Sequence, residues 1–470
     1  MSKLVISVTT DFSETVLNNV KLIEFTNPDG SVASAIFAAQ QLGPGQGPIQ
    51  ADVAIDGSDG INRIVATGNS LSVTRWTFSD WGREDVVTIK GTASFDEAEG
   101  TIKADRIFGF NGSDFLFGMA GDDTISGGSD GDRISGGPGD DVVLGGGGND
   151  DMQGDEGHNI LMGGGGDDLI TSITTKGDSI NGGGGLDHLD FYAGQDGDIV
   201  IDIRDGGGGR GIGGGTTISS IEQLNFSGFS GGGNDRVMGG SLDDFALGGS
   251  GDDRIWGFGG DDRLIGGEGD DVLHGGAGND LFQSWNGEGI DRIEGGTGTD
   301  TAGIYNDSFS GQMIDISDGG GGRDIGTGTT LRDIEILVFR GGKGDDTVTG
   351  GSGDDSLGGG SGNDELTGGH GEDIFYFDKK SIGVANGVIT DFTQGGDSID
   401  MSVIDATPGL PGNSFTFIRD KAFSMTAGEL RYVHDGTDTI VEADLTGDGE
   451  ADFVFTLSSL IDLAAGDFVL

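Results

Sequence analysis

Apolar residues recur at every ninth position through the middle of this chain. From Gly109 the sequence divides without a slip into seven nonapeptides, from GFNGSDFLF to GGGGDDLIT, and the eighth place of each is apolar. Six turn residues followed by a three-residue strand, in which only the middle side chain points inward, would produce this pattern. The period therefore predicts an all-β fold, a parallel β-solenoid in which two nonapeptides make one eighteen-residue coil around a thin apolar core.

The same frame returns in two further blocks. One residue inserted near Ser172 shifts the frame in the first block, and a short insertion near Trp285 interrupts the second. Two segments between the blocks, starting at Ile201 and Ile314, repeat each other at an offset of 113 residues and end in apolar, strand-like runs. We expect them to continue the solenoid with irregular loops. The predicted organisation is a small N-terminal β domain at 1–100, repeat blocks at 101–190, 230–303 and 341–376, spacers at 191–229 and 304–340, and a small C-terminal β cap at 377–470.

Composition excludes several classes of function. The chain has 25 basic and 80 acidic residues among 470, a formal charge of −55, so nucleic acid and anionic membrane surfaces are poor partners. Glycine contributes 100 residues, and hydrophobic residues only 33%, which is too little for one large core. Cysteine is absent, which excludes disulfides, thiolate zinc sites and cysteine nucleophiles. The sequence predicts no transmembrane segment and no N-terminal secretory signal.

The sixth place of the nonapeptide is acidic or an amide. Stacked turns would bring aspartates from units i and i+2 together with backbone carbonyls that glycine leaves unshielded, and such hard oxygen ligands suit Ca²⁺ better than Mg²⁺. The candidate metal ligands are Asp114, Asp123, Asp132, Asp141, Asp150, Asp168, Asp178, Asp187, Asp235, Asp244, Asp253, Asp262, Asp271, Asp280, Asp291, Asp300, Asp346, Asp355, Asp364 and Asp373. The second aspartate of each Gly-Asp-Asp unit, at place five, is expected to face solvent.

The nonapeptides resemble the RTX (repeats-in-toxin) calcium-binding repeat, GGxGxDxUx, over about residues 101–376. The resemblance implies a parallel β-roll with an array of Ca²⁺ sites along both edges. Asn159 departs from the motif and lacks the carboxylate, which puts its sites with Asp141 and Asp178 in doubt. Carried over unit by unit, the resemblance pairs Asp114 with Asp132, Asp123 with Asp141, Asp132 with Asp150, Asp235 with Asp253, Asp244 with Asp262, Asp253 with Asp271, and Asp262 with Asp280.

Residues 377–470 resemble the C-terminal domain of serralysin-type proteins, through the runs VITDF at Val388 and GDSIDMS at Gly396 and the final Asp467-Phe-Val-Leu. In that family the C-terminal residues belong to an uncleaved type I secretion signal, so the resemblance implies export through a type I secretion apparatus. The stretch from Asp444 to Asp452 is similar to part of an EF-hand loop. Phe455 stands where that loop needs its bidentate glutamate, so a β-hairpin turn is the preferred interpretation.

Nothing in the motifs favours an enzyme. Gly-x-Ser-x-Gly occurs around Ser129 and Ser230, but both serines belong to the glycine-rich repeats, so composition explains them. No histidine has the H-E-x-x-H spacing of the serralysin protease domain; the five are His158, His188, His274, His370 and His434.

The sequence therefore predicts a secreted, extracellular, non-enzymatic calcium-binding protein with a structural or adhesive role. We expect the chain to remain unfolded without Ca²⁺, because its charge is high and its apolar content low, and to fold from the C-terminal cap when the ion binds. The alternative is a secreted enzyme or carbohydrate-binding protein whose active part is residues 1–100. In that reading Trp76, Phe78 and Trp81 would contact a cell-surface or matrix glycan, whereas in the first they belong to the core.

Overall fold

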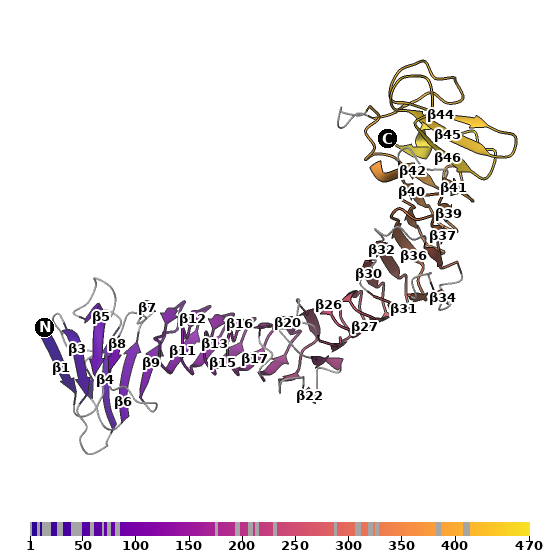
Figure 1. Cartoon of the computed structure of the whole chain (residues 1–470). Coiled ribbons are helices and arrows are strands. Elements are labelled where there is room, and N and C mark those ends of the chain that lie inside the picture. Colours follow the sequence, from indigo (N-terminus) through magenta and orange to yellow (C-terminus); the bar gives the residue numbers. More distant parts are fainter. Residues whose placement is uncertain are drawn as a thin grey trace. The chain divides into compact units, whose positions relative to one another are not determined.

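In the computed structural model of the chain, the described regular secondary structure is almost entirely β-strand, and most of the strands are parallel (Figure 1). It confirms the predicted parallel β-roll. Within residues 1–84 it describes strands β1 to β8. Beyond them it describes residues 85–173, 177–192, 198–204, 210–211, 216–228, 233–285, 289–305, 312–317, 323–324, 329–381, 387–407 and 414–470.

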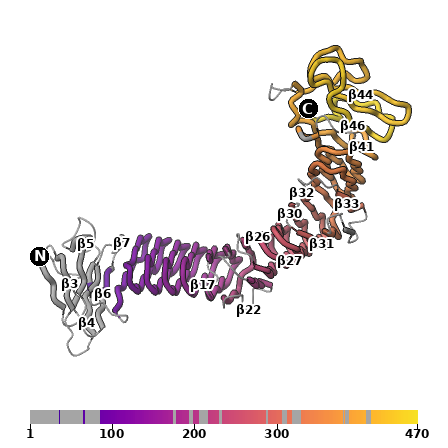
Figure 2. The backbone as a smooth tube through the Cα atoms, viewed as in Figure 1, coloured from indigo at the N-terminus to yellow at the C-terminus, as the bar shows by residue number. Residues whose placement is uncertain are grey.

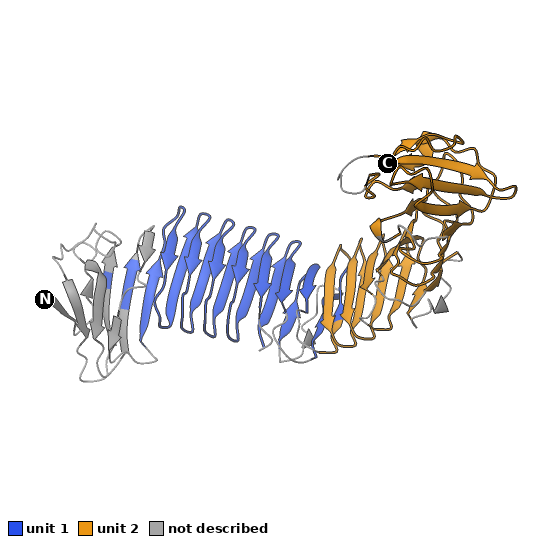
Figure 3. Cartoon of the chain, turned by 45° about the horizontal axis from the view of Figure 1, so that its top comes forward, with its two compact units in different colours: residues 1–231, 237–240 blue, residues 232–236, 241–470 orange. Residues whose placement is uncertain are grey.

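The chain forms two compact units, coloured separately in Figure 3. The first comprises Met1–Gly231 and Val237–Gly240, and the second comprises Gly232–Arg236 and Ser241–Leu470. Each unit contains nonapeptide blocks, so the division falls between the first and second blocks.

In the first unit the chain passes alternately between two predominantly parallel sheets, and Figure 2 shows the successive coils. One sheet consists of β7 (Ser70–Ser72), β10 (Glu97–Glu99), β12 (Phe115–Phe117), β14 (Arg133–Ser135), β16 (Asp151–Gln153), β18 (Leu169–Ser172), β20 (His188–Tyr192) and β24 (Gln223–Ser227). The other consists of β2 (Thr10–Asp11), β4 (Val32–Ala38), β6 (Ile61–Thr67), β9 (Val86–Lys90), β11 (Asp105–Asn111), β13 (Thr124–Ser129), β15 (Val142–Gly147), β17 (Ile160–Gly165), β19 (Ser179–Gly184), β23 (Thr217–Ser219) and β22 (Arg210–Gly211).

The register within each sheet follows the eighteen-residue coil. Leu116 lies opposite Ile134 in one sheet, and Ile125 lies opposite Val143 in the other. The eighth places are buried and form the core column, as the period predicted; in the first block they are Leu116, Ile125, Ile134, Val143, Met152, Leu161 and Ile170.

The strands of one sheet are longer than the three residues expected. β13 and β15 each span six residues, because pairing continues past the apolar position into the glycines of the next unit, where Gly128 lies opposite Gly146. Gly128 has a φ of 127°, and a side chain there would collide with the Phe110 carbonyl. The turn therefore needs glycine at this place, both for its backbone conformation and for the close stacking.

Parallel pairing extends to the N-terminal side of residue 101. Arg63 of β6 lies opposite Val86 of β9, Val87 lies opposite Asp105 of β11, and Ser70 of β7 lies opposite Glu97 of β10. A further parallel sheet contains β1 (Ser2–Ile6), β3 (Val20–Phe25), β5 (Ile49–Asp56) and β8 (Thr77–Ser79). The last strands of the segment expected as an N-terminal β domain thus belong to the same sheets as the repeats.

The spacers continue the solenoid, as their apolar runs predicted. In the first unit β19 pairs with β23 and β20 with β24, all in parallel. In the second unit β31 (Arg292–Thr297) pairs with β35 (Thr330–Arg332) in the same way, as does β32 (Thr301–Tyr305) with β36 (Ile336–Arg340). The two spacers therefore have the same strand pairing as well as similar sequences.

The described strands of the second unit belong to three sheets. The first has β26 (Phe245–Ser250), β28 (Arg263–Glu268), β30 (Leu281–Trp285), β32, β36, β38 (Ser356–Gly358), β40 (Ile374–Tyr376), β42 (Ser398–Asp400) and β47 (Phe468–Val469). The second has β27 (Arg254–Gly259), β29 (Val272–Ala277), β31, β35 and β34 (Arg323–Asp324). The third has β33 (Met313–Asp315), β37 (Thr347–Thr349), β39 (Glu365–Thr367), β41 (Gly387–Ile389), β46 (Phe453–Leu457), β45 (Thr439–Asp444), β44 (Glu429–His434) and β43 (Thr416–Phe417).

The C-terminal segment closes the second unit. β44, β45 and β46 are antiparallel, and β46 pairs in parallel with β41. β47 pairs with β42, placing Phe468 opposite Ile399. The remaining elements are β21 (Val200–Asp202), β25 (Arg236–Met238) and the 3-10 turns η3 (Lys379–Ser381) and η4 (Ala465–Asp467). None of the described residues lies in a helix long and apolar enough to cross a membrane.

Candidate metal centres in the stacked turns

The sixth-place aspartates are buried although they lie in turns. Each of the twenty candidate ligands has at most 6% of its surface exposed. Burial of a carboxylate costs free energy unless its oxygens find hydrogen-bond donors or cations. The partners of these oxygens therefore determine what the turns can bind.

One carboxylate oxygen of each sixth-place aspartate accepts a hydrogen bond from the turn one coil earlier. The amide of Asp114 donates to Oδ1 of Asp132 at 2.7 Å, and the amide of Asp123 donates to Oδ1 of Asp141 at 2.8 Å. The structure brings all the expected pairs together in this way; the others are Asp132 with Asp150, Asp235 with Asp253, Asp244 with Asp262, Asp253 with Asp271, and Asp262 with Asp280. Units i and i+2 thus form a continuous ladder along each edge.

The second oxygen lies beside the first-place glycine of its own unit. A side chain built at Gly109 would collide with Oδ2 of Asp114 and with the carbonyl oxygen of Gly127, one coil further on. Gly118 and Gly145 lie in the same surroundings, with Asp123 and Asp150 respectively. Among the residues that the structure describes, buried Oδ2 atoms without a hydrogen-bond partner occur in Asp114, Asp123, Asp132, Asp141, Asp150, Asp168, Asp187, Asp262, Asp271, Asp280, Asp300 and Asp346.

These surroundings fit Ca²⁺. A buried carboxylate oxygen and a backbone carbonyl converge on the space that glycine leaves, and Ca²⁺ prefers several hard oxygen ligands in a flexible arrangement. Within the described part of the chain no group of three or more His, Asp or Glu side chains has metal-binding geometry. Backbone carbonyls would therefore have to supply much of the coordination.

Electrostatics point in the same direction. Burial raises the pKa of Asp123 to about 9, and the neighbouring carboxylate of Asp105 adds to the shift. Burial also raises the pKa of Asp271 to about 8 and that of Asp132 to about 7. A carboxylate in such a place favours either a proton or a cation, because each removes the cost of an isolated buried charge.

Asn159 keeps the hydrogen-bond ladder but changes the cradle, by which we mean the space beside the first-place glycine that a second side-chain oxygen and a backbone carbonyl line. Its Oδ1 accepts the amide of Asp141 at 2.9 Å, and its own amide donates to Oδ1 of Asp178 at 2.7 Å across the inserted residue. The atom nearest a side chain built at Gly154 is Nδ2 of Asn159, a donor that repels a cation. The insertion near Ser172 therefore leaves the ladder intact, whereas the amide makes this turn unsuitable for a metal.

At both insertions a serine hydroxyl donates a hydrogen bond to Oδ2 of a sixth-place aspartate. Ser172 donates to Oδ2 of Asp178 at 2.7 Å, and Ser284 donates to Oδ2 of Asp291 at 2.6 Å. In each case the serine lies in the last strand before the insertion, and the aspartate is the first sixth-place residue after it. Asp178 and Asp291 are thus less suitable ligands than the other candidates.

Local amides donate to the Oδ2 atoms of the aspartates at the ends of the array. The Thr92 amide donates to Oδ2 of Asp96 at 2.6 Å, and the amide of Thr101 bonds Oδ2 of Asp105 in the same way. At the other end Asp397 accepts the amides of Thr393 and Asp373. Sequence reasoning missed these three aspartates because their units are irregular, although Asp105 lies in the frame of the unit that begins at Gly100.

The spacers also contribute residues that the sequence frame did not identify. Oε2 of Glu222 accepts the amide of Asp187, and Oε2 of Glu335 accepts that of Asp300, each at 2.9 Å. The carbonyl groups that line these two cradles belong to Ser220 and Asp333, both at a φ of 50°. These residues are related by the offset of 113, which is the signal that could have identified them.

The fifth-place residues are exposed, as expected, but they form a second ladder. Oδ1 of Asp252 accepts the amide of Asp270 at 3.0 Å, and the amide of Asp252 donates to Oδ1 of Asn234 at 2.9 Å. This ladder runs opposite to the first, because its acceptor lies in the earlier turn. Asparagine serves as well as aspartate, so the hydrogen bond does not depend on the charge.

The structure describes two of the remaining motifs. The stretch from Asp444 to Asp452 is the expected hairpin turn between β45 and β46, and Asp444 accepts the Gly447 amide at 2.6 Å. Ser129 donates to Oδ1 of Asn111 at 2.9 Å. Ser230, Trp76 and Trp81 lie outside the described residues, as does the side chain of Phe78.

The comparison with protein families agrees with this geometry. The family model of the RTX calcium-binding nonapeptide repeat matches overlapping segments that together cover residues 90–172, 229–302 and 338–379. No curated protein matches the sequence. The chain therefore carries RTX calcium-binding repeats. The matched segments contain the sixth-place aspartates from Asp114 to Asp168, from Asp235 to Asp300 and from Asp346 to Asp373.

Proposed function

We propose that this chain is a secreted, non-enzymatic scaffold that Ca²⁺ folds outside the cell and that serves a structural or adhesive role. Its ligands are the sixth-place aspartates other than Asp178 and Asp291, whose second oxygens accept serine hydroxyls, together with carbonyls of the first-place glycines. The observation that carries the proposal is the convergence of Asp114 Oδ2 and the Gly127 carbonyl on the space beside Gly109, repeated from turn to turn.

The proposed folding switch follows from charge and burial. A chain with a formal charge of −55 must bring many carboxylates into stacked turns, and without cations their repulsion opposes the compact state. Because Ca²⁺ binds the stacked turns better than the open chain, its binding free energy contributes to folding. Extracellular calcium modules bind at roughly millimolar concentrations, so the chain would fold outside the cell and remain open in the cytosol.

The proposed export route rests on the resemblance of residues 377–470 to serralysin-type C-terminal domains. In the folded chain Asp467 and Phe468 are buried, and β47 belongs to a sheet. A secretion apparatus could therefore read these residues only before the cap folds, which agrees with export of an unfolded chain.

Calcium titration of the purified full chain tests the function. Isothermal titration calorimetry should detect many ions per chain, about ten or more, with weak competition by Mg²⁺. Circular dichroism should change from coil to β-structure as Ca²⁺ is added. A chain that binds one or two ions, or that is well folded after complete removal of Ca²⁺ at neutral pH, would contradict the proposal.

Export and catalysis need separate measurements. Deletion of residues 377–470 should keep the chain inside cells that carry a type I secretion apparatus, whereas the full chain should appear in the medium. Screening the calcium-loaded chain against glycoside, ester and peptide substrates should detect no turnover. Hydrolysis that survives removal of the repeats would instead favour an active N-terminal segment.

A further inference from the structure

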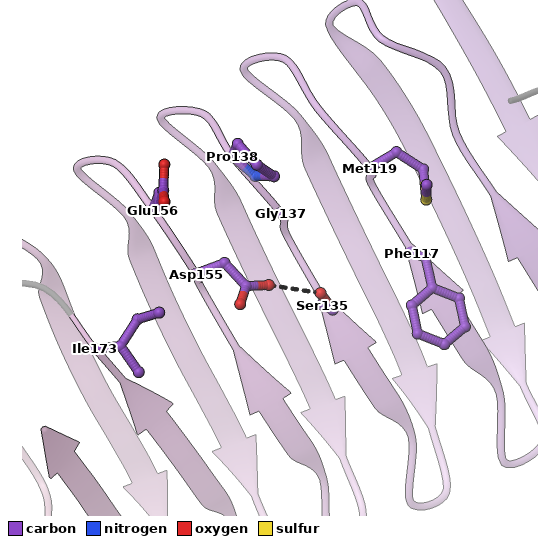
Figure 4. Close-up of a pocket in the computed structure, with 8 residues that line it drawn as sticks. All are labelled: Phe117, Met119, Ser135, Gly137, Pro138, Asp155, Glu156 and Ile173. Carbon is purple, nitrogen blue, oxygen red and sulfur yellow. Dashed lines mark hydrogen bonds between the residues drawn. The ribbon is translucent and has the colours of Figure 1, made fainter.

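A groove runs along one edge of the first unit, between a sheet and the neighbouring turns. Its volume is about 370 Å³, and the residues around it come from successive coils (Figure 4). Met119, Gly137 and Asp155 stand at the same place in three coils, eighteen residues apart. The missing side chain at Gly137 creates the hollow between the other two.

The two ends of the groove differ in chemistry. Phe117 and Met119 form an apolar end, Asp155 and Glu156 supply two carboxylates beyond Gly137, and Ile173 lies one coil further on (Figure 4). Ser135 donates to Oδ2 of Asp155 at 2.7 Å and Nε2 of Gln153 donates to its Oδ1, so two hydrogen bonds hold this carboxylate at the edge of the hollow. The groove therefore suits a ligand that carries an apolar group and a cationic group at separate points.

The backbone is strained at Met119 and at Asp155. Met119 and Asp155 occupy the second place of their nonapeptides, where glycine is usual, and their φ angles are 81° and 65°. Non-glycine residues rarely adopt this conformation, and such strain concentrates at functional sites. Met119 nevertheless leaves 41% of its surface exposed, so burial in its own fold does not explain its presence.

We propose that this groove docks a short, extended segment of another protein in which a lysine or arginine follows an apolar residue at a distance of about three positions. Met119 and Asp155 are two coils apart, or about 10 Å at the usual spacing between strands, and three extended residues span about the same distance. The apolar side chain lies against Phe117 and Met119, and the cation pairs with Asp155 and Glu156.

The negative charge of the chain favours a basic segment of another protein in this groove over a second copy of the chain. Each copy carries a formal charge of −55 before Ca²⁺ binds, and about ten bound ions would still leave it strongly negative, so two copies repel each other whereas a basic partner is attracted. The inference rests on the interaction role proposed above and supplies the chemistry of the partner.

The test uses the full chain in roughly millimolar Ca²⁺. Fluorescence anisotropy measures the affinity for a labelled peptide of repeated Leu-Gly-Gly-Lys, with Ser-Gly-Gly-Lys as a probe of equal charge. Met119→Gly should weaken binding of the leucine peptide by about tenfold. This substitution leaves the net charge unchanged and relieves the backbone strain, so the variant should melt no lower than the parent. Asp155→Asn should also weaken binding, since the amide cannot pair with the cation.

Phe258→Gly is the matched control, because Phe258 is another exposed second-place residue, with a φ of 75°, and lies outside the groove. It should leave the affinity within about twofold of the parent. Equal affinities of Met119→Gly and the parent, or of the two peptides, would show that only long-range attraction operates and would overturn the docking site. The calcium titration is independent of this result, so failure of the docking site leaves the proposed folding function separately testable.

Discussion

The backbone amide of Asp253 donates a hydrogen bond of 2.8 Å to Oδ1 of Asp271, eighteen residues further along the chain. Oδ1 of Asp253 in turn accepts the amide of Asp235 at 2.7 Å. Each aspartate of the array therefore connects three successive coils, and a change at one position should affect its neighbours on both sides.

Asp253→Ala should remove about two Ca²⁺ ions per chain, because Asp253 belongs to the pairs with both Asp235 and Asp271. It also leaves the Asp235 amide without its acceptor, which should lower the free energy of unfolding by about 1–3 kcal/mol. Asp252→Asn is the control, since an amide can still accept the hydrogen bond from Asp270. Native mass spectrometry would count the ions, and equal losses in both variants would mean that the frame is wrong.

Asp271→Asn and Asp291→Asn should differ, although both residues belong to one ladder. Oδ2 of Asp291 already accepts the hydroxyl of Ser284 at 2.6 Å, whereas Oδ2 of Asp271 has no such donor among the described residues. We expect Asp271→Asn to lower the calorimetric stoichiometry and Asp291→Asn to leave it unchanged. A loss of ions in Asp291→Asn would show that the serine does not replace the metal.

Gly145→Ala should abolish one calcium site and destabilise the chain by about 1–3 kcal/mol, because the methyl group would occupy the cradle beside Asp150. At Gly147, two residues further along the same strand, an added methyl group would have no atom within 4 Å. Gly147→Ala should therefore leave both the ion count and the thermal midpoint nearly unchanged. Similar behaviour of the two variants in calcium titration and thermal melting would argue against a metal in the cradle.

The metal-free chain should become more stable as the pH falls. Burial raises the pKa of Asp132 to about 7, of Asp271 to about 8 and of Asp123 to about 9, from an ordinary value of 3.8. The folded state therefore binds more protons than the unfolded state at pH values between 3.8 and these raised pKa values. The resulting stability is fully present below about pH 3.8 and disappears as the pH rises through about 7 to 9.

Circular dichroism of extensively dialysed, calcium-free protein between pH 4 and 9, with thermal melts at the pH values where the chain is folded, would measure this dependence. In the presence of Ca²⁺ the proton competes for the same oxygens, so calcium affinity should fall as the medium becomes acidic. A metal-free chain that is most stable at pH 8 would contradict the protonation of the buried carboxylates.

The nonapeptide period was sufficient to predict the solenoid, the core column and the meeting of aspartates from units i and i+2, but not the burial of those aspartates. Leu116 and Asp114 are buried because every coil repeats the same alternation of inward and outward positions. The period could not predict that β13 would run on through Gly128, since strand length there depends on stacking against the neighbouring coil.

The irregular parts of the site were harder to predict for a physical reason. Glu222 reaches the amide of Asp187 with a longer side chain, and Ser220 supplies a carbonyl through its backbone. Neither residue matches the sixth-place pattern, because different atoms can satisfy the same amide or line the same cradle. Only a comparison between the two spacers would have identified them from the sequence.

The eighteen-residue register also limits how such a chain can change in length. Removal of two adjacent nonapeptides would leave every remaining turn with an equivalent neighbour on each side, because Ile125 would still face a branched apolar residue of the same sheet. Removal of a single nonapeptide would transfer all later strands to the opposite sheet. The pairing of β47 with β42, which closes the second unit, would then be lost. Gene duplications and deletions that preserve this fold should therefore occur in whole coils, and the three blocks can differ in length without any change in the chemistry of a single turn.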